Sequence, residues 1–287
     1  MRPPRAQYMT GDTVNELVEF YYRYLGRNGG LEAHFDLFKN RYKSDPKAAI
    51  AEAVVFSLLW AEGLQPELFE DVSKGGPDFC IKSSPSETFL VEVTSLDSAM
   101  VSKRSGLPSS ITRHGGGAFG LITDRLLSEA KNKAPQLGLH HLPGVLAITS
   151  DHAFASILLD GLAAEYLMTS APQFNAPLDG RPTFTSTDLR HSVFYKPLRV
   201  VDTNGAPIIE PCRQSIAAIL LMAIDAREVQ VVGLLHPEAI YPFAPGWLPK
   251  VPFVKFRGQV SPTNIDTEWI QADASDRVAT FPHRHIQ

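Results

Sequence analysis

Hydrophobic residues recur at helical spacing along the first part of the chain. The pattern predicts three helices, at residues 13–25, 31–42 and about 47–62. Asp45 followed by Pro46 is typical of a helix start, because an aspartate side chain caps free backbone N–H groups and proline fits the first turn. We therefore expect a helical segment that is followed by the helix that begins the main fold.

From residue 66 onward, hydrophobic and polar residues alternate as they do in strands. The pattern predicts strands at 68–72, 78–81 and 88–94, of which the last two form a hairpin. Beyond the hairpin it predicts, in chain order, a mobile surface loop at 95–120, a helix at 121–137, a strand at 145–149, a helix at 151–168, a loop at 170–190 and strands at 192–195 and 229–235. Residues 213–224 mix strand and helix signals, and the tail beyond Pro237 has no clear period.

This order of elements predicts an α/β fold with a mixed central β-sheet flanked by helices. No shift in composition divides the chain, so we expect one domain over residues 1–287. Within it we distinguish an N-terminal helical segment (1–44), a core (45–150) and a C-terminal extension (151–287) whose helices and strands complete the sheet.

Composition excludes several classes of protein. Hydrophobic residues make up 44% and charged residues 20%, which is typical of a packed globular chain. The net charge of −4 excludes a surface that binds polyanions all over, and two cysteines exclude a disulfide framework or a cysteine-rich zinc site. No apolar run reaches the roughly 20 residues that a membrane span needs, and no export signal opens the chain. We therefore expect a cytoplasmic protein without a membrane partner.

Three acidic residues stand where a charge is costly. Glu52 has Ala48, Ala49, Val55 and Phe56 as its helical neighbours, Asp78 begins an apolar strand, and Glu92 lies in the middle of one. An unpaired carboxylate in such surroundings costs several kcal/mol, so each must be paired, protonated or bound to a cation.

Each acid taken alone has a simpler explanation. Glu92 can point outward from its strand, Glu52 can reach solvent beside the apolar stripe, and Asp78 can cap a turn. Together, a helix and the two strands of a hairpin can bring the three carboxylates to one edge of the sheet. Such a set of oxygen ligands suits Mg²⁺ or Mn²⁺.

The motif residues resemble those of the PD-(D/E)xK nuclease superfamily, which has the restriction-endonuclease-like fold. The resemblance rests on Gly76-Pro77-Asp78-Phe79 and on Val91-Glu92-Val93-Thr94-Ser95, in an αβββαβ order of elements over about residues 45–150. It implies hydrolysis of phosphodiester bonds in DNA, or in RNA, with Mg²⁺ or Mn²⁺ as cofactor. It also implies that Asp78 and Glu92 bind the metal, that the backbone carbonyl of Val93 completes its coordination, and that Glu52 binds a second ion or a water.

One position departs from the family pattern. Thr94 stands where the family has a lysine that orients the attacking water and offsets charge on the phosphate. Either another lysine replaces it or the protein is an inactive nuclease-fold module that binds or supports a partner. Lys133 is our candidate for the catalytic lysine, with Gln136 beside it at a Lys-x-x-Gln spacing; Lys131 lies about 200° from Lys133 around the predicted helix. An unrelated α/β enzyme is a third alternative.

The residues around this helix carry most of the local positive charge. Between residues 96 and 142, six basic residues stand against three acidic ones, in an otherwise acidic chain. We expect the loop at 97–118 to close over nucleic acid; the alternative is that the loop is merely polar. The substrate-binding candidates are Thr94, Lys103, Arg104, Arg113, Lys131 and Gln136. A homodimer is left open.

Overall fold

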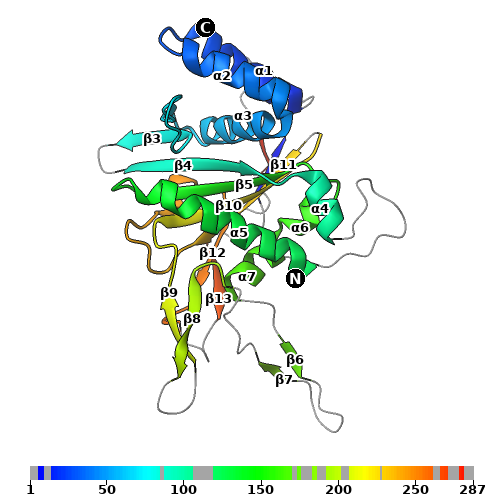
Figure 1. Cartoon of the computed structure of the whole chain (residues 1–287), viewed down its shortest axis with the longest axis vertical. Coiled ribbons are helices and arrows are strands. Elements are labelled where there is room, and N and C mark those ends of the chain that lie inside the picture. The colour runs from blue at the N-terminus through cyan, green and yellow to red at the C-terminus, as the bar shows by residue number, and fades with distance from the viewer. Residues whose placement is uncertain are drawn as a thin grey trace.

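The chain folds into a mixed β-sheet with helices on both faces (Figure 1), which confirms the predicted fold class. The computed structural model describes residues 6–9, 14–84, 87–105, 119–169, 173–175, 183–185, 192–201, 207–226, 228–260, 266–270 and 278–280. Within these residues, no helix is both long and apolar enough to cross a bilayer.

Ten strands form the main sheet. Eight of them follow the order β13-β12-β11-β10-β5-β4-β3-β2, while β1 pairs with β11 and β14 pairs with β1. Their bounds are β1 Ala6–Met9, β2 Pro66–Leu68, β3 Phe79–Ser84, β4 Glu87–Ser95, β5 Gly144–Ser150, β10 Ile216–Ile224, β11 Glu228–Leu235, β12 Phe253–Phe256, β13 Thr267–Ile270 and β14 Val278–Thr280. The central β5 is parallel to β4 and β10, whereas β3 and β4 form the predicted antiparallel hairpin.

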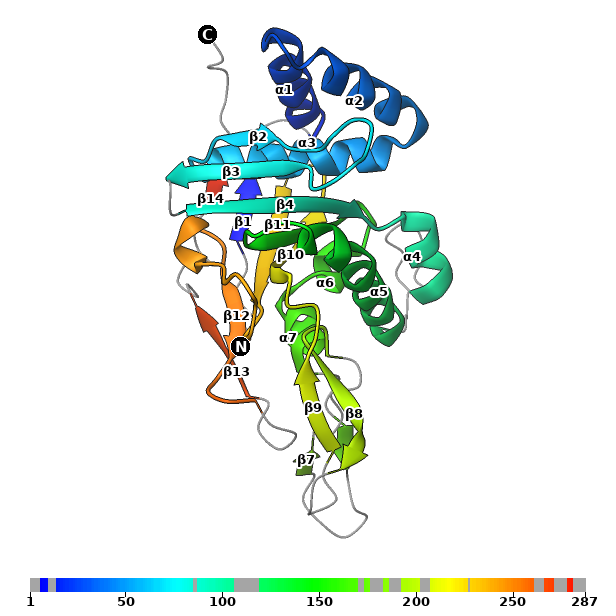
Figure 2. The same ribbon diagram turned by 60° about the vertical axis from the view of Figure 1, so that its left-hand side comes forward.

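Two further strand pairs stand apart from the main sheet. They are β6 (Gln173–Asn175) with β7 (Thr183–Thr185), and β8 (Tyr195–Val201) with β9 (Pro207–Pro211). Figure 2 shows β8 and β9 at the end of the molecule opposite the N-terminal helices.

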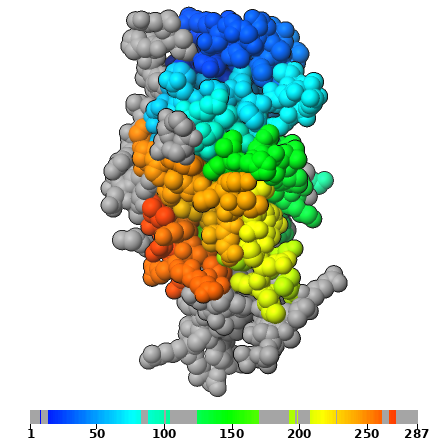
Figure 3. Space-filling model, turned by 90° about the vertical axis from the view of Figure 1, so that its left-hand side faces the viewer, coloured from blue at the N-terminus to red at the C-terminus, as the bar shows by residue number. Residues whose placement is uncertain are grey.

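Two groups of helices cover the two faces of the sheet. The helices α1 (Val14–Arg27), α2 (Glu32–Ser44) and α3 (Pro46–Ala61) pack as a layered group on one face. The other face is covered by α4 (Ser98–Ser105), α5 (Phe119–Gly138), α6 (Ala155–Leu158) and α7 (Gly161–Thr169). Figure 3 shows the blue N-terminal helices resting on the cyan segment around β3 and β4. Helix α3 is apolar on most sides, as expected for a helix that lies between the sheet and the outer helices, and Glu52 is its one buried charged residue.

Alternation along β4 decides which face each residue reaches. Val91 packs in the core beneath α3, whereas Leu90 packs in the core beneath α5. By the same alternation, Glu92 and Thr94 point toward α5. The predicted start of α3 at Asp45 is confirmed. The Asp45 side chain accepts a hydrogen bond from the backbone N–H of Ala48 at 3.2 Å.

Several predicted elements are wrong in position or kind. The strand expected at 68–72 is β2, which ends at Leu68, because Asp71 instead folds a turn by accepting hydrogen bonds from Ser73 and Lys74. The helix expected at 151–168 is two helices, since Asp160 accepts a hydrogen bond from the N–H of Ala163 and starts α7 afresh.

Other differences concern loops and the tail. The loop expected at 95–120 contains α4 in its first part, and residues 106–118 lie outside the described residues. Of the ambiguous residues 213–224, those from Ile216 to Ile224 form strand β10, which is buried throughout and apolar on both faces. The strand expected at 192–195 begins only at Tyr195 as β8, and the tail contributes β12 and β13 to the sheet.

Candidate functional site

Asp78 lies where the β3–β4 hairpin opens. Gly75 and Gly76 adopt φ values of 74° and 135°, which favour glycine, and Pro77 has no N–H to continue the ladder. The pairing of the two strands therefore ends at Phe79 opposite Val91. Beyond that point the Asp78 carboxylate takes the place of a strand neighbour, because its Oδ2 accepts the N–H of Val93 at 2.7 Å.

Glu92 and Lys133 meet on the α5 side of this opening. Lys133 Nζ donates to Glu92 Oε1 at 2.6 Å, and the Glu92 side chain is only 4% exposed. The other oxygen, Glu92 Oε2, is buried and has no hydrogen-bond partner among the described residues. The two residues that we expected to act together are thus in contact, and one carboxylate oxygen remains available.

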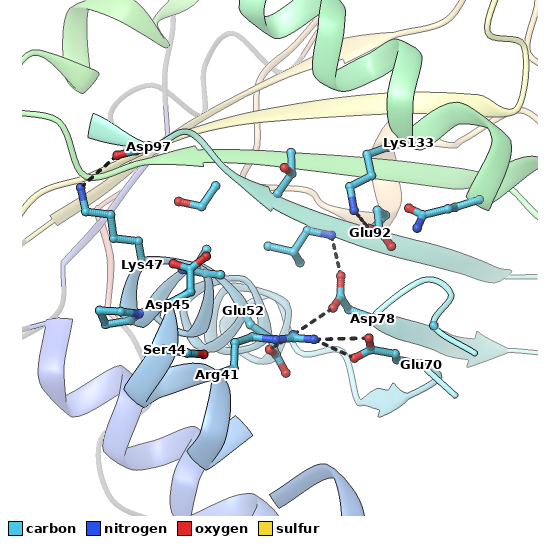
Figure 4. A pocket seen from close by; sticks show the side chains of 18 of the residues that line it. Arg41, Ser44, Asp45, Lys47, Glu52, Glu70, Asp78, Glu92, Asp97 and Lys133 are labelled. Carbon is cyan, nitrogen blue, oxygen red and sulfur yellow. Dashed lines mark hydrogen bonds and ion pairs between the residues drawn. The ribbon is translucent and has the colours of Figure 1, made fainter. Parts of the chain in front are cut away.

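A cavity of about 620 Å³ joins these residues (Figure 4). Its lining carries six acidic and three basic residues: Asp45, Glu52, Glu70, Asp78, Glu92, Asp97, Arg41, Lys47 and Lys133. The neutral part of the lining includes Gly75, Gly76, Val93, Thr94, Ser95 and Gln136. All three predicted acids therefore line one cavity, which confirms that the fold brings them together.

Arg41 from α2 holds the acids on the other side. Its Nη1 donates to Glu52 Oε2 at 2.5 Å and lies 3.8 Å from Asp78 Oδ1, while its Nη2 donates to both carboxylate oxygens of Glu70, at 3.3 and 3.2 Å. Tyr21 donates to the second oxygen of Glu52 at 2.7 Å. Both oxygens of Glu52 are thereby engaged, so this acid is buried as a paired group, one of the three states expected for it.

The sequence pattern did not single out Arg41 or Glu70 as site residues. One signal for Arg41 was available, because it follows the apolar Phe38 by three residues and so lies on the inward side of its helix. Glu70 gave no such signal, since the strand predicted around it does not extend that far. Figure 4 shows Arg41 reaching Glu70 and Asp78 from the side opposite Lys133.

The remaining candidates fall into three groups. Thr94 and Gln136 line the cavity; Thr94 donates to Glu129 Oε2 at 3.3 Å, and Gln136 Oε1 is buried without a hydrogen-bond partner among the described residues. Lys131 on α5 and Lys103 on α4 are exposed, outside the cavity lining within the described part of the chain. The Arg104 side chain and all of Arg113 lie outside the described residues.

Burial makes the charged forms of the acids costly. It raises the pKa of Asp78 well above the ordinary value of 3.8, and the nearby charges of Glu92 and Glu52 raise it further. Burial likewise raises the pKa values of Glu92 and Glu52 above 4.5, although Lys133 opposes the shift of Glu92 and Arg41 opposes that of Glu52. The ion pairs therefore only partly offset the cost of burying the carboxylates.

These raised pKa values predict an unusual pH dependence of stability. A raised folded-state pKa means that the folded protein binds more protons than the unfolded chain, so the contribution of Asp78 and Glu92 to the free energy of unfolding falls as pH rises above about 4. With a chelator present, we expect the melting temperature to fall between about pH 5 and pH 8. Thermal unfolding across this range measures it, and the double variant D78N/E92Q should lose most of the slope. If the melting temperature depended equally on pH in the wild-type protein and the double variant, Asp78 and Glu92 would not be the source of the dependence.

The predicted metal site of three carboxylates is not formed. Across the described residues, no group of three or more histidine, cysteine, aspartate or glutamate side chains is arranged to hold a metal ion. A smaller set remains, because Mg²⁺ usually takes one or two carboxylates and completes its coordination with water and substrate. Asp78 and Glu92 are two such carboxylates, and the buried Glu92 Oε2 has no hydrogen-bond partner among the described residues, so it is free to serve as a ligand.

Comparison of the chain with protein-family models, with curated proteins and with solved structures returned no match. The resemblance to the PD-(D/E)xK superfamily therefore stays a prediction that rests on the motif residues.

Proposed function

We propose that this protein is a divalent-metal-dependent nuclease that hydrolyses phosphodiester bonds in DNA, with RNA as the second choice of substrate. One observation carries the proposal: the buried carboxylates of Asp78 and Glu92 line one cavity with the Lys133 ammonium, 2.6 Å from Glu92. Two acids and a lysine are the residue types that the family pattern requires, and here the lysine comes from α5 instead of β4.

The order of elements supports the same fold assignment. Between residues 46 and 150 the chain runs α3, β2, β3, β4, α5 and β5, with the short α4 inserted before α5. This matches the αβββαβ order of the restriction-endonuclease-like core, and the acids lie at the hairpin where that core has its motif. We therefore propose this core for residues 45–150.

The excess of acidic residues in the cavity lining favours a bound cation. Six acids against three bases would repel the phosphate of a nucleic acid from the cavity. A divalent cation held by Asp78 and Glu92 would offset most of this negative charge and supply Lewis acidity toward the phosphate and a nearby water. In this proposal Glu52 serves to hold Arg41, and the Val93 backbone carbonyl remains a candidate ligand.

The other polar groups act on the substrate. The Lys133 ammonium, oriented by Glu92, would donate a hydrogen bond to the attacking water or to a phosphate oxygen and offset its negative charge. Gln136 Oε1 would accept a hydrogen from the same water, because it lines the cavity and has no partner among the described residues. Thr94 lines the same cavity, and its hydroxyl is held in place by the hydrogen bond that it donates to Glu129.

A second candidate function is an inactive nuclease-fold module. The internal ion pairs favour it, since Arg41 and Lys133 already neutralise part of the acidic charge without any metal. Such a module would keep the fold as a support for a partner and would not hydrolyse nucleic acid.

Calorimetric titration with Mn²⁺ and Mg²⁺, paired with an assay on labelled DNA and RNA oligonucleotides, tests the two candidates. The nuclease proposal expects saturable binding of the ion, cleavage that requires it, and neither in a chelator. Metal binding without cleavage of either polymer would favour the inactive module. If neither Mn²⁺ nor Mg²⁺ produced heat of binding at any pH, the proposed metal site would be refuted.

A further inference from the structure

The Arg41 guanidinium binds carboxylates that lie beside the proposed metal ligands. In a two-ion nuclease site, a second cation is held by carboxylates adjoining the first ion, about 4 Å away. Here the carboxylates beside Asp78 and Glu92 are those of Glu52 and Glu70, and the Arg41 guanidinium binds both of them. It also lies 3.8 Å from Asp78, so it adjoins the proposed metal ligand directly.

The guanidinium is suited to this position. Arginine is always protonated and offers donors in a fixed planar fork, so that one group can serve several carboxylates at once. The three acids that it joins come from α3, from the segment after β2 and from the start of β3. Only a quarter of the Arg41 side chain is exposed. The Tyr21 hydroxyl donates a hydrogen bond to the Glu52 oxygen that Arg41 does not bind.

The formal charges lead to the same stoichiometry. Four carboxylates, those of Glu52, Glu70, Asp78 and Glu92, lie within ion-pair distance of two cationic side chains, Arg41 and Lys133. When all are ionised, two negative charges remain, which one divalent cation neutralises. A second divalent ion would bring an excess of positive charge and would have to displace the guanidinium.

We propose that Arg41 is the resident cation of a one-metal site, a positioning residue that holds Glu52 and Glu70 in place of a second divalent ion. This inference rests on the proposed function, because it presumes that Asp78 and Glu92 bind a metal. It adds that the helices outside the resembling region complete the site. The N-terminal helical segment is thus expected to be necessary for the site's selectivity for one ion.

The number of Mn²⁺ ions bound by the full chain tests this inference, by calorimetry and by electron paramagnetic resonance. The wild-type chain is expected to bind one ion. Arg41→Ala is expected to bind two, with spin coupling between ions about 4 Å apart. Arg23→Ala removes an exposed arginine that is paired with Glu19 on α1, and this matched control should bind one ion.

A second pair of variants covers the case in which Arg41→Ala does not fold, because removing one partner of a buried ion pair strands the other charge. Glu52→Gln removes that charge. Relative to E52Q, the double variant R41A/E52Q should bind its first Mn²⁺ at least about tenfold more tightly, since a cation beside the site has been removed.

The outcomes separate the two proposals. No binding by the wild-type chain would overturn the proposed function and this inference with it. One ion in the wild-type chain and one in a folded R41A would overturn the inference alone, as would two ions in the wild-type chain. Equal affinity of E52Q and R41A/E52Q would also overturn it.

Discussion

Replacing Asp78 with asparagine is expected to abolish metal-dependent cleavage while the folded protein becomes more stable. Asparagine keeps an oxygen that can accept the Val93 N–H, so the hairpin opening survives. It cannot hold a divalent cation as a carboxylate does, so we expect the rate to fall at least about a thousandfold, which corresponds to about 4 kcal/mol.

The gain in stability has the same cause as the raised pKa of Asp78. The wild-type protein buries a carboxylate beside two other acids, and a neutral amide of the same shape removes that cost. We expect about 1 kcal/mol more free energy of unfolding at neutral pH in a chelator, measured by denaturant titration.

A matched control distinguishes the site from a general effect of charge. Asp36→Asn changes an exposed aspartate on α2, with 70% of its side chain accessible, and should alter neither rate nor stability. Cleavage by D78N at the wild-type rate would contradict the assignment of Asp78, whatever its stability.

Replacing Lys133 with methionine is the second large effect that we expect. Methionine matches the lysine side chain as far as Cε but lacks the ammonium that lies 2.6 Å from Glu92. The rate should fall by about 10² to 10⁴, the usual contribution of a positioned charged or acid–base group. Binding of Mn²⁺ should persist, because Glu92 Oε1 is then released to join the unpartnered Oε2.

Lys131→Met provides the control on the same helix. Lys131 is exposed and lies two residues away, on the other side of α5, so its replacement should leave both rate and metal affinity unchanged. If the two lysine variants lost the same activity, a general contribution of positive charge on α5 would replace the specific role of Lys133.

Much of the site was predictable because the free-energy cost of burying a carboxylate depends on residues that are close to it in the sequence. The apolar neighbours of Glu52 and Glu92 already required a compensating partner, and the hairpin that follows Gly75-Gly76-Pro77 brought Asp78 and Glu92 near one another. The helical spacing of Lys131 and Lys133 showed that only one of them could face the site. These inferences use neighbours within a turn of helix or across one hairpin.

The identity of each partner was not predictable in the same way. Arg41 lies 11 residues before Glu52 and on another helix, and Lys133 lies 41 residues after Glu92. Which cation reaches which acid depends on how α2 packs on α3 and how α5 packs on the opposite face of the sheet. Similarly, the strand expected around Glu70 depended on a short apolar pattern that the turn at Asp71 overrode.

The sequence by itself determined the α/β class, the capped start of α3, the β3–β4 hairpin and the need for charge compensation at three buried acids. Only the tertiary structure decided that Arg41 compensates Glu52, that Lys133 compensates Glu92, and that Glu92 Oε2 is left without a partner among the described residues. The physical reason is that periodicity and capping reflect contacts within a few residues. Ion pairs between elements form only after the hydrophobic faces of those elements have packed.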